Sequence, residues 1–173
     1  MSKNLIIYYS RAGENYVNGA IVNLPKGNTE ICAEFVQKAV GGDLFEVRTT
    51  KPYAADYNAC IEEAKQELHT AARPELEAYL DDISAYDNIF VLGPCWWGTY
   101  PMAVFSLLER LDFHGKNVMA LMTHEGSGMG SSERDLHRLC MGATFGTSIA
   151  VHGADAEKAE MTISAWAKKN TQE

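Results

Sequence analysis

Polar side chains gather around the start of an expected helix near the amino end of the chain. Ser10 and Arg11 follow a short apolar segment, and residues 27–30 (Gly-Asn-Thr-Glu) come directly before a helix-like pattern. Unpaired N–H groups and the helix dipole both favour an anion at a helix N-terminus. We therefore expect Ser10, Asn28 and Thr29, with Arg11 as a further candidate, to bind an anion such as a phosphate. The alternative is that Asn28 or Thr29 only caps the helix.

The loop after the apolar segment 88–93 is rich in aromatic side chains. Residues 93–101 read Gly-Pro-Cys-Trp-Trp-Gly-Thr-Tyr-Pro. Exposed tryptophans are costly unless something apolar covers them, and a planar ring system would stack on them. We expect this loop to form the aromatic wall of a binding site. The alternative is that Trp96 and Trp97 pack on neighbouring helices, and Cys95 has no partner cysteine nearby, so we expect an inert thiol.

A third loop, residues 123–131, reads Thr-His-Glu-Gly-Ser-Gly-Met-Gly-Ser. Its glycines let the backbone approach a ligand closely and present N–H groups to it. The Gly-x-Ser-x-Gly spacing of a hydrolase nucleophile fails around Ser127, and Gly-x-Gly-x-x-Gly fails at Ser131. A Ser127–His124 hydrolase is therefore disfavoured. We expect His124 and Glu125 to hydrogen-bond the edge of a cofactor, and a catalytic role for them is the alternative.

Strand-like and helix-like segments alternate along the whole chain. Five strands are expected at 5–9, 44–48, 88–93, 118–123 and 148–151, and helical segments at 29–40, 57–68, 76–80, 101–111, 132–140 and 159–167. The alternation and the near-continuous apolar strands predict a parallel sheet with helices on both faces. We predict a single α/β domain over residues 1–173, doubly wound, with strand order 2-1-3-4-5. Such folds bind ligands at the carboxyl ends of strands 1, 3 and 4, which precede the three loops above.

Composition excludes several classes of protein. The chain has 173 residues, with 15 Lys+Arg against 23 Asp+Glu, and a net charge of −8 argues against nucleic-acid binding. No apolar run approaches the roughly 18 residues that span a membrane, and no secretion signal is recognised, so a cytoplasmic location is expected. The four cysteines are far apart in the sequence, and we expect reduced thiols and no metal site.

An anion site, an aromatic wall and a glycine-rich amide surface together suit a phosphorylated flat ring system. FMN fits, with its phosphate on the first loop and its ring between the other two. Residues 10–16 (Ser-Arg-Ala-Gly-Glu-Asn-Tyr), followed by Gly-Asn-Thr-Glu at 27–30, resemble a split phosphate loop in a subgroup of the flavodoxin-like family. The resemblance covers nearly the whole chain and is of the short-chain type.

The resemblance also implies which residues would contact FMN. It adds Asn15 to Ser10, Arg11, Asn28 and Thr29 around the phosphate. On the other two loops the implied contacts are Pro94, Cys95, Trp96, Trp97, Gly98, Thr99, Thr123, His124, Glu125, Gly126, Ser127 and Gly128.

Two functions are expected on this scaffold. The favoured one is electron transport, in which bound FMN exchanges electrons with redox partner proteins. The alternative is an FMN-dependent NAD(P)H:quinone-type oxidoreductase, in which His124 and Tyr100 orient the substrate or supply a proton. Either a monomer or a homodimer is compatible. A phospho-receiver domain is disfavoured because Tyr9-Ser10 and Gly93-Pro94 stand where it needs carboxylates.

Overall fold

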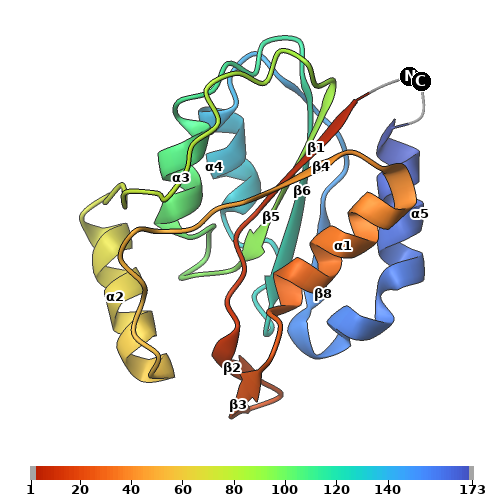
Figure 1. Ribbon diagram of the computed structural model, residues 1–173. Helices are drawn as coiled ribbons and strands as arrows, with labels where there is room; N and C mark the ends of the chain where they lie inside the picture. Colours follow the sequence, from red (N-terminus) through yellow and green to blue (C-terminus); the bar gives the residue numbers. More distant parts are fainter. Residues whose placement is uncertain (1–2, 172–173) are drawn as a thin grey trace.

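A parallel sheet forms the centre of the protein in a computed structural model that describes residues 3–171 (Figure 1). Its strands are β1 (Asn4–Tyr8), β4 (Asp43–Glu46), β5 (Asn88–Pro94), β6 (Asn117–His124), β7 (Thr144–Phe145) and β8 (Ile149–His152). They lie in the order β4-β1-β5-β6-β7, β8 also pairs with β6, and every pair is parallel. Burial on both faces explains why β1 and β5 are apolar along almost their whole length.

Helices cover both faces of this sheet, as predicted. They are α1 (Asn28–Val40), α3 (Met102–Leu108), α4 (Ser132–Leu139) and α5 (Glu160–Thr171), with a 3-10 helix η1 at Gly153–Lys158. Successive side chains of a strand point to opposite faces. Ile6 and Phe90 therefore pack with α1 and α5, whereas Leu5 and Ile89 pack with α3 and α4. The α/β fold is confirmed.

Helix α2 (Tyr57–His69) stands beside the sheet instead of covering it (Figure 1). It begins at Asp56, whose carboxylate accepts a hydrogen bond of 2.8 Å from the N–H of Ala59. Only Cys60 and Ala64 of this helix are buried. Most of α2 does not pack into the core, so its side chains are free to line cavities.

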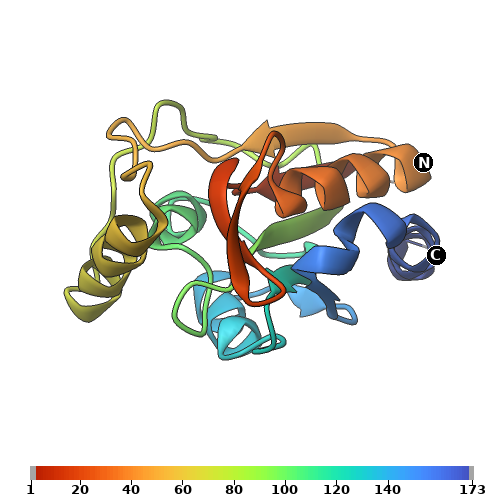
Figure 2. The same ribbon diagram turned by 90° about the horizontal axis from the view of Figure 1, so that it is seen from below.

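A β-hairpin that the sequence did not predict occupies much of the segment between β1 and α1. Its strands, β2 (Gly13–Val17) and β3 (Ala20–Leu24), are antiparallel and are joined by Asn18 and Gly19. Both turn residues have positive φ, 50° and 84°, which fits a two-residue type I′ turn. In the view from below, the hairpin crosses the end of the sheet (Figure 2).

Two parts of the predicted arrangement need correction. The five-strand scheme 2-1-3-4-5 is incomplete, because the edge next to β6 is divided into β7 and β8 and the sheet has six strands. The helical turn expected over 76–80 is wrong. Leu76 instead forms a bridge with Thr49, since the segment after Pro74 runs in extended form beside residues 48–50.

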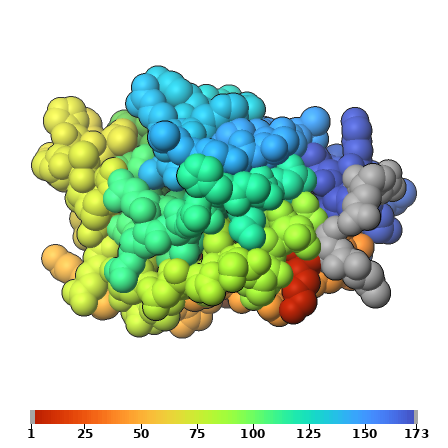
Figure 3. Space-filling view, turned by 90° about the horizontal axis from the view of Figure 1, so that it is seen from above, coloured from red at the N-terminus to blue at the C-terminus, as the bar shows by residue number. Residues whose placement is uncertain are grey.

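The amino ends of three strands are joined by buried asparagine side chains. Asn88 Nδ2 donates to Asn4 Oδ1 at 2.9 Å, and Asn117 Nδ2 donates to Asn88 Oδ1 at 3.1 Å. Loops around residues 80–90 and 110–117 close this end of the molecule (Figure 3). Among the helices between residues 3 and 171, none has the length and apolarity that crossing a membrane requires.

Replacing Phe90 by Ala tests the core between the sheet and α5. Phe90 is fully buried, and its ring packs edge-on against Trp166 at 5.5 Å between centroids. We expect Phe90→Ala to lower the free energy of unfolding by about 3–5 kcal/mol in urea titrations. The control Met161→Ala removes an 86% exposed side chain from α5 and should change it by less than about 0.5 kcal/mol. Equal losses in the two variants would contradict this packing.

Candidate functional site

A cavity of about 330 Å³ lies at the carboxyl ends of β5 and β6, beside the start of α1. Ten residues predicted from the sequence line it, together with three that were not predicted. The lining residues are Asn15, Tyr16, Asn28, Tyr57, Pro94, Cys95, Trp96, Thr123, His124, Glu125, Gly126, Ser127 and Gly153. The structure thus brings the three loops together at one place.

The N-terminus of α1 presents free hydrogen-bond donors. In the described part of the chain, no carbonyl or side chain accepts from the N–H groups of Asn28 and Thr29, while Ser10 Oγ accepts from the N–H of Glu30 at 3.0 Å. Gly27 allows this close approach, because a Cβ there would lie 2.1 Å from Ser10 Oγ. Two backbone N–H groups and the Ser10 hydroxyl can therefore face an anion.

The hydroxyl of Thr29 lies in a different place from the one that the sequence analysis expected. Its side chain is buried, and its Oγ1 lies 2.8 Å from Thr123 Oγ1. The hydroxyl pair joins α1 to the end of β6, and neither oxygen is left without a partner. Thr29 can thus serve an anion through its backbone N–H, while its side chain fixes the position of α1.

Arg11 holds the hairpin instead of lining this cavity. Its guanidinium donates to the carbonyl oxygens of Glu14, Ala54 and Ala55 at 2.9, 3.0 and 3.1 Å. Its own carbonyl accepts from Asn15 Nδ2 at 2.9 Å. Arg11 therefore connects the start of β2 to the segment before α2, and its side chain lines a neighbouring cavity.

The two adjacent tryptophans have separate surroundings. Trp96 lines the cavity and packs edge-on against Tyr9 and Tyr53, with centroids 5.1 and 5.0 Å apart. Trp97 is 48% exposed, and its Nε1 donates to the carbonyl of Ile61 in α2 at 2.8 Å. Trp96 is thus a wall of the cavity, whereas Trp97 packs on a helix, as the alternative interpretation proposed.

Besides Arg11 and Trp97, five predicted residues do not line the cavity: Ser10, Thr29, Gly98, Thr99 and Gly128. Thr99 is buried and donates through Oγ1 to Asp135 Oδ2 at 2.6 Å. The carbonyl of Gly98 accepts from the N–H of Ser131 at 2.6 Å. These contacts attach the aromatic loop to the start of α4 and fix its position.

The third loop holds His124 in a defined tautomer. The N–H of Gly126 donates to His124 Nδ1 at 2.9 Å, so the neutral ring carries its proton on Nε2. Burial lowers the pKa of His124, and the ring of His152, 5.7 Å away between centroids, lowers it further. The negative charge of Glu125 raises the pKa of His124. His124 therefore favours the neutral form, which can donate from Nε2.

Three lining residues escaped the sequence analysis. Tyr16 comes from the hairpin and stacks on Tyr57 of α2, with centroids 6.0 Å apart and an interplanar angle of 22°. Gly153 follows β8, and a Cβ there would lie 2.5 Å from Glu125 Oε1 and 2.7 Å from Asn28 Nδ2. Its place directly after a strand could have identified Gly153, and Tyr16 ends the motif of residues 10–16, but nothing in the sequence indicated Tyr57.

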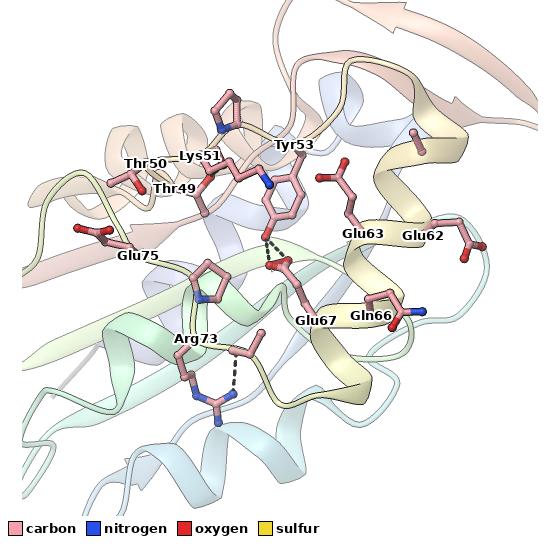
Figure 4. Close-up of a pocket in the computed structure, with 14 residues that line it drawn as sticks. Thr49, Thr50, Lys51, Tyr53, Glu62, Glu63, Gln66, Glu67, Arg73 and Glu75 are labelled. Carbon is pink, nitrogen blue, oxygen red and sulfur yellow. Dashed lines mark hydrogen bonds between the residues drawn. The ribbon is translucent and has the colours of Figure 1, made fainter.

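A larger cavity, about 860 Å³, lies on the other side of α2 (Figure 4). None of the predicted site residues lines it. Tyr53 separates the two regions, because its ring contacts Trp96 while its hydroxyl donates to the carboxylate of Glu67. Burial raises the pKa of Glu67. The three loops meet only at the smaller cavity, which we therefore take as the candidate site.

Comparison with known proteins agrees with the fold. A family model described as flavodoxin matches residues 21–170. Solved structures described as flavoproteins are similar to the chain: one from Bacteroides eggerthii is 25% identical over 100% of both chains, with a TM-score of 0.78. One from Bacteroides uniformis is 26% identical, over 96% of this chain and 98% of its own, with a TM-score of 0.74.

A third solved structure is a Lactobacillus acidophilus flavoprotein in complex with FMN. It is 19% identical over 91% of this chain and 98% of its own, with a TM-score of 0.64, and this likeness shows the fold. No curated protein matches the chain.

The titration of His124 tests the geometry of the third loop. We expect its ring-proton NMR signal to titrate with a midpoint below 6.5, the ordinary value. His152→Gln should raise this midpoint, whereas His69→Gln, on the distant end of α2, should not move it. The unfolded chain binds this proton more readily, so His124 should lower the free energy of unfolding as the pH falls from 6.5 to its folded-state pKa. A midpoint above 6.5 would contradict the burial.

Proposed function

Because the chain belongs to the flavodoxin family, we propose that it is an electron-transfer flavoprotein that passes electrons through bound FMN to or from redox partners. One observation carries this proposal: the three loops meet in a cavity at the surface, with exposed aromatic rings beside it. Tyr16 is 43% exposed and Trp97 is 48% exposed. A cofactor held there presents an edge that another protein can reach, as a carrier requires.

The residues at the cavity fit FMN. Asn28 and Thr29 offer backbone N–H groups, and Ser10 offers a hydroxyl, for a phosphate at the start of α1. Gly153 leaves space next to Asn28 that any larger residue would fill. When bound, FMN supplies one- and two-electron redox chemistry, and the protein supplies binding, orientation and electrostatics.

Aromatic rings and loop amides provide the walls for a flat ring system. Trp96 and Tyr57 line the cavity from the aromatic loop and from α2, and residues 124–127 (His-Glu-Gly-Ser) line it from the third loop. His124 holds its proton at Nε2 because Nδ1 accepts from Gly126. It can therefore donate one hydrogen bond toward a bound group without carrying a positive charge.

Negative charge surrounds the site and supports an exchange of electrons with another protein. The chain carries a net charge of −8, Glu125 lines the cavity, and the carboxylate of Glu14 in β2 accepts a hydrogen bond from the N–H of Tyr57 at the start of α2. Negative charge beside a flavin opposes the addition of further electrons and so lowers its potential. The same charge attracts a basic protein surface and raises the rate of encounter.

The alternative function, an NAD(P)H:quinone-type oxidoreductase, also has an observation in its favour. A second cavity of about 260 Å³ adjoins the first and shares Asn15, Tyr57, Cys95 and Trp96 with it, which leaves room for a small molecule beside a bound flavin. The prediction that Tyr100 assists that reaction is wrong. Tyr100 is fully buried and its hydroxyl donates to the carbonyl of Val91 at 2.8 Å, so it cannot reach a substrate.

Binding of FMN and of riboflavin separates the phosphate contacts from the ring contacts. We expect the purified protein to bind FMN and quench its fluorescence. Asn28→Asp places a carboxylate beside the expected phosphate and should weaken FMN by about tenfold or more, because like charges at close range cost over ~1.4 kcal/mol. Riboflavin binding should change little. Gln66→Glu adds the same charge far along α2 and is the control. Equal losses for FMN and riboflavin would remove the phosphate assignment.

Turnover with a reduced nicotinamide distinguishes the two functions. We expect the FMN-loaded protein to oxidise NADH or NADPH only slowly, with or without a quinone. Adding a separate flavoprotein reductase should greatly speed the reduction of a downstream acceptor. The absorbance of the nicotinamide reports both reactions. Rapid catalytic turnover without the reductase would contradict the carrier function and support the oxidoreductase.

A further inference from the structure

Strand β3 leaves one edge of the hairpin without a partner. In a two-residue type I′ hairpin the residues that flank the turn, Val17 and Ala20, form a hydrogen-bonded pair. Hydrogen-bonded and non-hydrogen-bonded pairs then alternate, so Ile21 and Asn23 point their backbone N–H and C=O groups away from β2. Among the described residues, no donor or acceptor meets these groups.

Strand β2, by contrast, lies against the body of the chain, although of the outward-pointing backbone groups of Glu14 and Tyr16 only the Glu14 carbonyl has a partner among the described residues. Arg11 Nε donates to the carbonyl of Glu14, and the Glu14 carboxylate accepts from the N–H of Tyr57 at 2.7 Å. Glu125 Oε2 also accepts from the N–H of Asn18 at the turn, at 3.1 Å. The hairpin is therefore attached to the body along β2 and at its tip, and β3 is the strand that faces outward.

The free edge is apolar and carries no charged side chain, and Pro25 follows its last residue, Leu24. Ile21 is 46% exposed and Val22 is 36% exposed. Residues 15–25 (Asn-Tyr-Val-Asn-Gly-Ala-Ile-Val-Asn-Leu-Pro) contain no charged side chain, although 38 of the 173 residues are charged (15 Lys+Arg and 23 Asp+Glu). Natural edge strands are usually guarded by charges, bulges or a covering segment, because an exposed apolar edge pairs with other chains.

We propose that β3 pairs antiparallel with β3 of a second copy of this chain, around a two-fold axis at Val22. In this register the outward-pointing Ile21 of one copy lies opposite Asn23 of the other, and the two exchange both backbone hydrogen bonds. Val22 lies opposite its own copy in a close, non-hydrogen-bonded pair. The result is one continuous four-stranded ribbon, in which each β2 faces the body of its own chain.

Charge decides between a second copy and another protein. A partner attracted by the −8 net charge of the chain would present basic residues. This strand has no acidic side chain with which those basic residues could form an ion pair. Self-pairing brings Ala20, Val22 and Leu24 of the two copies together on one face, and it places no like charges opposite each other. The uncharged segment is thus matched to its own copy.

The pairing goes beyond the electron-transfer role and does not require the cofactor. It does act next to the site, because Asn15 and Tyr16 of β2 line the candidate cavity. In the dimer, the hairpin would be held from both of its sides, by the body of its own chain and by the second copy.

Sedimentation of the full chain without FMN tests the dimer. We expect a mass twice that of the 19.1 kDa chain. Val22→Asp places two carboxylates directly opposite each other and should return the mass to that of one chain. Val22→Thr keeps a β-branched side chain and should remain dimeric. A wild-type monomer at every concentration, or a Val22→Asp dimer as stable as the wild type, would overturn the proposal.

A cross-linking variant tests the register and does not depend on how Val22→Asp folds. In a non-hydrogen-bonded pair the two Cα atoms lie about 4.5 Å apart, within the range that a disulfide spans. Val22→Cys should therefore form a disulfide-linked dimer at least tenfold faster under mild oxidation than Met161→Cys, at an 86% exposed position on α5. Equal rates in the two variants would overturn the pairing at Val22.

Discussion

A sheet made only of parallel strands brings the carboxyl ends of all its strands to one edge, and this constraint places the whole candidate site. The strand register aligns the ends of neighbouring strands closely, because Tyr8 lies opposite Leu92 and Pro94 lies opposite Thr123. Buried asparagine side chains join the same three strands at their amino ends. Because both ends of the register are fixed, the loops after β1, β5 and β6 begin side by side and can form one cavity.

One wall of the cavity comes from elements that pack on the central sheet. The opposite wall, which we call the added wall, comes from the hairpin and α2, which lie outside that core. The start of α1 is fixed to β6 through the buried hydroxyl pair of Thr29 and Thr123. The added wall does not pack on the sheet and is held by individual contacts, such as Arg11 with the carbonyls before α2 and Trp97 with Ile61. Such a wall can change between relatives while the core and the anion site stay the same.

The hairpin takes part in both proposals, the cofactor site and the pairing of two copies. Its strand β2 contributes Asn15 and Tyr16 to the cavity, and its strand β3 presents the free edge that we assign to a second copy. A hairpin alone is marginally stable in water, so its position depends on what holds it. Glu14 and Glu125 hold it within the chain, through the N–H groups of Tyr57 and Asn18. Pairing across two copies would add a third support to this wall of the candidate site.

The sequence by itself determined the α/β fold and most of the strands, because hydrophobic periodicity acts over short stretches of chain, and the parallel-sheet rule placed the three loops at one end of the sheet. The resemblance to the flavodoxin-like family then implied the contacts on those loops, and ten of the predicted residues line the cavity. The sequence could not indicate the hairpin, since β2 and β3 carry their apolar side chains in the open instead of in an alternating buried pattern. It also did not reveal the partners of the side chains of Arg11, Thr29 and Trp97. Each of these has a partner distant in sequence, at Ala54, Thr123 and Ile61. Only the tertiary structure decides which of several possible partners a polar or aromatic side chain meets, because that choice depends on distances between elements that no local pattern encodes.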